Sequence, residues 1–122
     1  MRKILLSINP EHVNNILNGT KKYEFRKVRC KELVNEILIY STSPVMKVVA
    51  SASVKSVLDD SPEALWAATH EWAGIDKEFF DRYYGDSNRA IAYELGKITI
   101  FEEPRSLEDY GILHAPQSFA YI

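Results

Sequence analysis

Cysteine, glycine, proline and long apolar runs are all scarce in this 122-residue sequence. The single cysteine, Cys30, excludes an internal disulfide framework. No apolar run approaches the roughly 20 residues that a membrane-spanning helix needs, and the apolar stretch after the basic start is too short for a secretory signal. Neither a repeat nor a low-complexity segment is visible. We therefore expect one domain over residues 1–122, cytoplasmic and without a membrane partner.

Several kinds of catalytic motif are missing as well. His12, His70 and His114 are far apart, and no Cys-x-x-Cys, His-x-x-x-His or acidic loop indicates a metal site. No glycine-rich loop ends in a lysine and a hydroxyl residue to hold phosphates. Basic neighbours would lower the thiol pKa of an exposed Cys30, but no spacing identifies a histidine partner. We expect an ordinary cysteine, no metal and no cofactor.

Charge is distributed unevenly, although the formal net charge is only −2. Residues 1–58 hold ten basic and four acidic side chains, whereas residues 59–122 hold five basic and thirteen acidic ones. Six of the basic residues lie between positions 21 and 31. Such a cluster can concentrate a polyanion even on an acidic protein. The alternative is a solvated edge strand, since lysines commonly protect sheet edges.

The densest part of this cluster is the run Lys21, Lys22, Glu24 and Arg26, which follows a short helix and Gly19. On a regular strand, Lys22, Glu24 and Arg26 share one face, while Lys21 lies at the less regular entrance. Arg26 offers a planar fork for a phosphate or a base edge. Glu24 can orient Arg26, accept an exocyclic amine or act as a general base, and Lys21 can hold a phosphate or stabilise an oxyanion. Alternatively, a Glu24–Arg26 pair merely holds the structure together.

The first half of the chain reads as one helix among strands. An apolar strand is expected at residues 3–8, followed by a helix that Asn9 can cap and Pro10 can start. Gly19 suits the left-handed position after that helix. Two further strands are expected at residues 36–40 and 47–58, with a turn at residues 41–44 between them.

The second half begins with two expected helices. The first opens at Pro62 and runs to about Trp72, and the second lies between a capping Asp76 and Gly85. We expect the aromatic residues of the second helix, Phe79, Phe80, Tyr83 and Tyr84, to point inward.

Two strands follow these helices. The first is expected at residues 89–101, where the apolar alternation slips at Gly96 as a β-bulge would cause. A last strand is expected at residues 119–122. The order β-α-β-β-β-α-α-β-β predicts an α+β fold, a small and mostly antiparallel β-barrel with helices covering its ends.

One family pattern matches these residues. An early Ser-x-x-Pro before a helix, followed by Gly-x-Lys-x-x-Glu-x-Arg, resembles the ASCH domain of the PUA-like superfamily of small β-barrels. The matching residues here are Ser7, Pro10, Gly19, Lys21, Glu24 and Arg26. Residues 39–44 and 115–122 also resemble the family, and the ending is similar to a prokaryotic and phage branch labelled predicted transcriptional regulators.

The resemblance implies a cleft beside the first helix that binds RNA or a modified nucleoside. One branch of the superfamily is similar to amidohydrolases that cleave N4-acetylcytidine, with a catalytic lysine at the position of Lys21 and a catalytic threonine at the position of Glu24. A carboxylate cannot serve as that hydroxyl nucleophile, so this activity is not expected here. Other ASCH proteins have been linked to ribonuclease activity, which Lys21, Glu24 and Arg26 could support.

The remaining candidate ligand contacts are polar or aromatic residues near the expected cleft: Ser7, Asn9, Tyr40, Ser41, Thr42, Gln117 and Ser118. An aromatic ring at Tyr40 can stack on a base, or can equally be a core tyrosine before an ordinary turn. One of Tyr83 and Tyr84 is a further candidate. Trp66 and Trp72 have helical spacing, which favours a core position.

We therefore expect a binding domain for RNA or a modified nucleotide, with a regulatory role and a cleft around Lys21, Glu24 and Arg26. The alternative is a small hydrolase, either a ribonuclease or a nucleoside amidohydrolase-like enzyme, that uses the same residues for catalysis. A third interpretation is an interaction domain whose acidic second half contacts a protein partner.

Overall fold

A six-stranded sheet organises the chain in the computed structural model, which describes residues 2–122. The elements follow in the order β1 (Arg2–Ile8), α1 (Pro10–Leu17), β2 (Tyr23–Arg26), β3 (Val34–Ser41), β4 (Lys47–Asp60), α2 (Pro62–Thr69), η1 (His70–Trp72), α3 (Lys77–Tyr84), β5 (Ala90–Arg105), η2 (Leu107–Tyr110) and β6 (Phe119–Tyr121). The labels η1 and η2 denote short 3-10 helices. This order confirms the expected succession of strands and helices.

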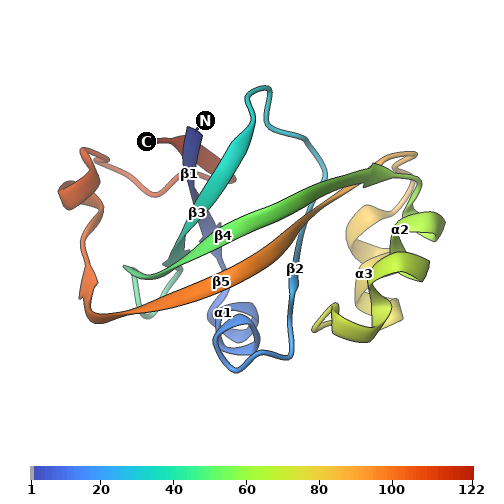
Figure 1. Ribbon diagram of the computed structural model, residues 1–122, viewed down its shortest axis with the longest axis horizontal. Helices are drawn as coiled ribbons and strands as arrows, with labels where there is room; N and C mark the ends of the chain where they lie inside the picture. The colour runs from blue at the N-terminus through green and yellow to red at the C-terminus, as the bar shows by residue number, and fades with distance from the viewer. Residues whose placement is uncertain (1) are drawn as a thin grey trace.

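The strands lie in the order β2-β5-β4-β3-β1-β6. Only β1 and β3 are parallel, and the other four neighbouring pairs are antiparallel. Long β4 and β5 cross the molecule together, with α2 and α3 at one end of this ribbon and α1 beside the sheet (Figure 1). The predicted small, mostly antiparallel α+β fold is confirmed, and the sheet is curled into a half-barrel.

The helix boundaries follow from local sequence. Pro10 starts α1, and Gly19 after it has φ +87°, a conformation that costs glycine little because it lacks a Cβ. Asp76 caps α3 through a side-chain oxygen that accepts the N–H of Phe79. Asn9 occupies the capping position of α1, but its side chain makes no cap and instead accepts a hydrogen bond from Thr42.

The predicted irregularity at Gly96 is present. Leu95 pairs with Val54, whereas Ile98 pairs with Ala52, so β5 contains one more residue than β4 over this interval. A β-bulge has this two-against-one count. The slip in apolar alternation therefore came from a real insertion in the strand.

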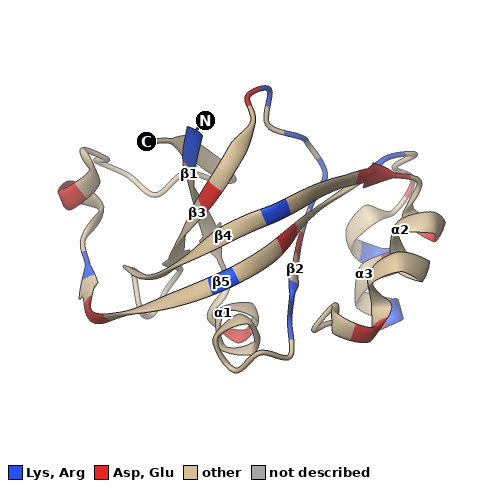
Figure 2. Cartoon of the chain, viewed as in Figure 1, with Lys and Arg blue, Asp and Glu red and all other residues tan. Residues whose placement is uncertain are grey.

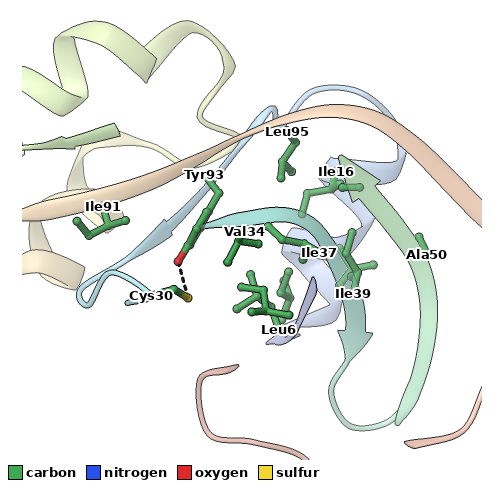
Figure 3. Packing of buried hydrophobic residues seen from close by; sticks show 14 residues of the cluster. Leu6, Ile16, Cys30, Val34, Ile37, Ile39, Ala50, Ile91, Tyr93 and Leu95 are labelled. Carbon is green, nitrogen blue, oxygen red and sulfur yellow. Dashed lines mark hydrogen bonds between the residues drawn. The ribbon is translucent and has the colours of Figure 1, made fainter. Parts of the chain in front are cut away.

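Two apolar clusters hold the helices to the sheet. The larger one lies between α1 and the sheet, and its centre includes Tyr93, whose hydroxyl donates to Sγ of Cys30 over 3.0 Å (Figure 3). The smaller one packs α2 and α3 against β2 and β5, with Leu65 and Phe80 each 1% exposed. The second cluster fixes the position of α3, one wall of the site described below.

Three aromatic side chains differ from their expected positions. On α3, Phe80 and Tyr84 are buried one turn apart, whereas the neighbouring helix face carries an exposed Phe79 and a half-buried Tyr83. Trp72 is 46% exposed rather than in the core, because the α-helix ends at Thr69 and a 3-10 turn redirects the last residues. Trp66 packs against the smaller cluster, as its spacing predicted.

A candidate ligand-binding cleft

A cavity of about 220 Å³ opens where β1, α1, β2 and α3 meet. Its polar lining consists of Ser7, Asn9, His12, Lys21, Glu24 and Arg26. Its apolar and aromatic lining consists of Ile8, Phe25, Ile75, Phe79 and Tyr83. We call this cavity the cleft. Basic residues run through β2 and the segments on either side of it, so one wall of the cleft is part of the basic cluster (Figure 2).

Lys21 is nearly buried, with 3% of its surface exposed. Its main-chain N–H donates to Asn15 at the end of α1, which places it just ahead of β2. Its Nζ donates to the carbonyl oxygen of Ala73 at 2.9 Å and lies 4.8 Å from the ring centre of Phe25. Burial lowers the pKa of Lys21, and the nearby carboxylate of Glu24 partly opposes this shift.

Gly74 makes room for this lysine. A Cβ on Gly74 would lie 2.7 Å from Cγ of Lys21, closer than real side-chain atoms approach. Gly74 also has φ +70°, which disfavours other residues. Gly74 therefore lets the Lys21 side chain pack against the turn between η1 and α3.

Glu24 and Arg26 form a partly buried ion pair on one face of β2. Nε and Nη2 of Arg26 donate to the same carboxylate oxygen, Oε2, at 3.1 and 2.8 Å. Nη2 also donates to the main-chain oxygen of Ser7 at 2.9 Å. Because the two side chains are only 13% and 8% exposed, removing one partner would strand a charge at a cost of about 3–5 kcal/mol. The ion pair therefore helps to hold the structure together, which was the alternative role considered for it.

The pair nevertheless has unused hydrogen-bonding capacity. Within residues 2–122, Nη1 of Arg26 and Oε1 of Glu24 have no protein hydrogen-bond partner, and neither atom is buried from solvent. Both side chains line the cleft. A donor and an acceptor are therefore available next to each other, which suits the edge of a nucleobase.

His12 lines the cleft, although the spacing of the three histidines in the sequence indicates no metal site. Its Nδ1 is buried without a hydrogen-bond partner, and its ring meets the ring of Phe79 edge-on at 5.3 Å. Burial lowers the pKa of His12, and the positive charge of Lys21 lowers it further. The sequence signal for His12 was its spacing from Asn15, because residues three apart on α1 lie on the same side of the helix. The side chain of Asn15 donates to the main-chain oxygen of Gly74.

Two aromatic rings from α3 complete the cleft. Tyr83 lines it, as expected for one of the two adjacent tyrosines, and burial raises the pKa of its hydroxyl. Phe79 was expected to point into the core and instead lines the same cleft. Tyr84 is buried behind them, where its hydroxyl donates to the carbonyl oxygens of Arg26 and Ile91. The sequence reasoning missed Phe79 because its helix face is set by the docking of α3.

The cleft includes six of the predicted positions and excludes six. Ser7, Asn9, Lys21, Glu24 and Arg26 line it. Ser7 contributes mainly through its main chain, since its hydroxyl donates to Pro116. The sixth position is Tyr83, from the pair of adjacent tyrosines.

The side chains outside the lining are Lys22, Tyr40, Ser41, Thr42, Gln117 and Ser118, with Lys22 over the ring of Trp72. Regular strand alternation failed for Lys22 because β2 begins only at Tyr23. Tyr40 is 3% exposed in a separate apolar cluster, so its core interpretation is correct and it does not face the cleft.

Within residues 2–122, no group of three or more His, Cys, Asp or Glu side chains is arranged to hold a metal ion. The helices of this same part of the chain include none that is both long and apolar enough to span a membrane.

Comparison with known structures identifies the fold. The crystal structure of ASCH from Zymomonas mobilis superposes with a TM-score of 0.89 at 24% identity, covering 98% of this chain and 87% of that one. A mutant of the same protein gives a TM-score of 0.90 at 23% identity, covering 100% and 91%. This chain has the ASCH fold. The predicted resemblance to ASCH domains is therefore confirmed at the level of the fold, although no family model matches the sequence.

Curated relatives of this ASCH-fold chain have diverse names. Large ribosomal subunit protein uL22 from Ureaplasma parvum is 27% identical over 120 residues, which are 98% of this chain but 39% of that protein. ATP synthase subunit alpha from the same species is 26% identical over 121 residues, 98% of this chain and 15% of that protein. The chain thus spans about two-fifths or less of these two relatives, and neither name describes the matched segment alone.

A third relative carries the fold in its name. The ASCH domain-containing ribonuclease from Zymomonas mobilis is 26% identical over 95 residues, which cover 77% of this chain and 64% of that protein. Its name associates an ASCH domain with RNA cleavage in that organism.

Proposed function

We propose that this ASCH-fold chain binds RNA and holds one nucleotide in the cleft. The observation that carries this proposal is the set of nearly buried charges there: Lys21, Glu24 and Arg26 all line the cleft, and the last two have unused hydrogen-bonding atoms. Burying charges costs free energy unless a partner or a function compensates. The ribonuclease name of the Zymomonas relative favours RNA among nucleic acids.

The cleft suits a nucleotide in three respects. Lys21 and Arg26 are cations that can meet a phosphate. The adjacent donor of Arg26 and acceptor of Glu24 can read a base edge. Phe79 and Tyr83 offer rings on which an unpaired base can stack, the usual mode of single-stranded RNA recognition.

A binding titration tests the proposal. Purified protein is titrated against single-stranded RNA, structured RNA, DNA and modified nucleosides. Arg26→Lys keeps the charge but loses the planar fork, and Tyr83→Ala removes a ring while leaving the ion pair intact. Each change should weaken binding about 10-fold or more, since a hydrogen bond to a charged group or a stacked base contributes about 1–3 kcal/mol.

The matched control is Lys47→Ala, an exposed lysine outside the cleft. Circular dichroism would show whether each variant is folded. Loss of affinity in Lys47→Ala equal to that in Arg26→Lys and Tyr83→Ala would count against the cleft. A wild-type protein that binds no member of the panel would overturn the proposal.

Ribonuclease activity is a second candidate function, favoured by the named relative and by three groups in one cleft. Glu24 or His12 can accept the proton of a ribose 2′-hydroxyl, and a lowered pKa favours the neutral, proton-accepting form of His12 near pH 7. Lys21 can stabilise the negative charge that develops on the phosphate. An amide in Glu24→Gln keeps a similar shape but cannot take up this proton.

Turnover assays separate this candidate from binding alone. If Glu24 is the base, Glu24→Gln should lower RNA cleavage by at least about 100-fold while retaining much of the affinity. The assay uses labelled RNA in metal-free and metal-supplemented buffers, with product formation followed on gels. Absence of product from wild-type protein at high concentration would reject the enzymatic candidate and leave RNA binding standing.

A regulatory role, a cytoplasmic location and a protein partner stay predictions. The acidic second half was the basis for the partner, but one of its carboxylates, Asp59, forms ion pairs with Arg29 and Arg89. Pull-down experiments with a variant neutralised at Glu102 and Glu103 would test whether the exposed acidic end of β5 contacts another protein.

A further inference from the structure

A second hollow, of about 550 Å³, lies beside the cleft and shares Lys21 with it. It is bounded by the end of α1, the entrance to β2 and the bulged region of β4 and β5. None of its ten lining residues is acidic, and four are lysines: Lys21, Lys22, Lys55 and Lys97. We call this hollow the lysine groove. It gathers four of the chain's nine lysines on a protein whose net charge is negative.

Three lysines of this groove carry charges that no protein carboxylate neutralises. Within residues 2–122, Lys22, Lys55 and Lys97 form no ion pair, whereas Lys3 and Lys77 each contact an acid. Lys22 has its Nζ 4.2 Å from the ring centre of Trp72. The acid next to the groove in sequence, Glu94, accepts a hydrogen bond from Ser56 and does not line the groove. Grouped charges of one sign attract ligands of the opposite sign.

The bulge brings two of these lysines together. A Cβ on Gly96 would collide with the Ser53 hydroxyl and lie 3.0 Å from Cγ of Lys55. The hydroxyl of Ser53 also accepts the main-chain N–H of Lys97 at 2.8 Å. Since residue 96 has no side chain, Lys55 can lie against β5 next to Lys97. Basic bands on β4 and β5 are visible in Figure 2 near the basic entrance to β2.

We infer that the lysine groove binds the phosphate backbone of the RNA whose nucleotide occupies the cleft. This inference rests on the proposed function and extends it from one nucleotide to a strand. Lys21 lines both the cleft and the lysine groove. An RNA strand that leaves the cleft past this residue therefore meets Lys22, Lys55 and Lys97 next. Lysines act as point charges on phosphate and do not read bases, so the groove adds affinity without sequence preference.

Two double variants test this inference. Lys55→Gln with Lys97→Gln removes two groove charges, and Lys31→Gln with Lys47→Gln removes two exposed lysines that lie outside both hollows and form no ion pair. Affinities for a 12-nucleotide single-stranded RNA and for a nucleoside monophosphate are measured at several salt concentrations. Lys22 is left unchanged because it contacts Trp72.

The groove variant should bind the 12-nucleotide RNA about 10-fold more weakly, and its slope of log K against log salt should become shallower by about 1.4, or about 0.7 for each lost phosphate contact. The control variant should stay close to wild type, and both variants should bind the monophosphate normally. Equal loss in the two variants, or an unchanged salt slope in the groove variant, would overturn the inference.

The outcomes also separate this inference from the proposed function. If wild-type protein binds the monophosphate but gains nothing from a longer strand, the groove inference fails and the cleft stands. If wild-type protein binds neither ligand, both fail. Charge reversal in Lys55→Glu with Lys97→Glu provides a second variant pair, which should weaken RNA binding further than the glutamine changes do if the groove contacts phosphate.

Discussion

The charged residues of the cleft respond differently to burial. The guanidinium of Arg26 is held by two partners, the carboxylate of Glu24 and the main-chain oxygen of Ser7. Lys21 has a lowered pKa, and its ammonium group finds one carbonyl oxygen and the ring of Phe25. His12 has a lowered pKa and a buried nitrogen without a partner. The same cleft thus holds an ion pair and two groups that lose protons more easily than usual.

The lowered pKa of His12 predicts a pH-dependent stability. The unfolded chain protonates this imidazole at about its ordinary value of 6.5, whereas the folded chain does so only at lower pH. Between these values the unfolded state binds more protons, so the free energy of unfolding falls as pH falls below about 6.5. Urea unfolding at about pH 7.5 and about pH 5.5 measures this loss.

His12→Gln should reduce that loss, because glutamine does not titrate. The groups that face His12 electrostatically are Lys21, Glu24, Glu11 and Arg26, and all of them are kept in this variant. His114→Gln, at an exposed position outside the cleft, serves as the control. An identical pH dependence in wild type and His12→Gln would refute this account.

At the scale of elements, α3 has two faces with different functions. Phe80 and Tyr84 attach the helix to β2 and β5, while Phe79 and Tyr83 face the cleft. Successive residues of an α-helix point about 100° apart, so adjacent aromatic residues separate onto neighbouring faces. Sequence reasoning recognised α3 and both of its boundary residues, but it expected all four rings to point inward, with one of the two tyrosines as an alternative cleft residue.

The two faces predict opposite effects of neighbouring substitutions. Phe80→Ala should lower the free energy of unfolding by about 3–5 kcal/mol, because the side chain is fully buried and leaves a cavity. Phe79→Ala should cost about 1 kcal/mol or less, because this residue is 36% exposed, but it should weaken ligand binding. Urea titration and ligand titration of both variants provide the comparison. Similar destabilisation by both changes would contradict the division of α3 into two faces.

At the scale of the whole molecule, the cleft exists only in the folded chain. Its walls come from β1, α1, β2 and α3, and its lining residues extend along the chain from Ser7 to Tyr83. The groove adds β4 and β5 to the same assembly. A ligand that requires all these elements therefore binds the native state and not the unfolded chain, and its binding must stabilise the fold.

This linkage predicts a ligand-dependent unfolding temperature. A nucleotide at about 100 times its dissociation constant should add about 2.7 kcal/mol to the free energy of unfolding. Thermal unfolding followed by circular dichroism should shift upward for wild type and for Lys47→Ala. Tyr83→Ala should require a higher ligand concentration for the same shift. A shift of equal size at equal ligand concentration in all three proteins would show that the ligand binds elsewhere.

The sequence by itself determined the elements of this protein and the chemical character of its site. Pro10, Asp76 and the glycines mark helix ends through local backbone geometry, and alternation with a slip at Gly96 predicted a bulged strand. The spacing of Lys21, Glu24 and Arg26 indicated a charged wall and an ASCH resemblance that the fold confirms. These signals are local, so they survive without knowledge of the rest of the chain.

Only the tertiary structure decided which distant residues face those charges. His12, Phe79 and Tyr83 line the cleft because α1, which precedes β2 in the chain, and α3, which follows it, both lie beside β2. Tyr40 lies in another apolar cluster because its strand, β3, pairs with β1 and β4. Lys55 and Lys97 line the same groove because β4 pairs with β5 around the bulge. Such contacts depend on packing between elements, which no spacing within a single element encodes.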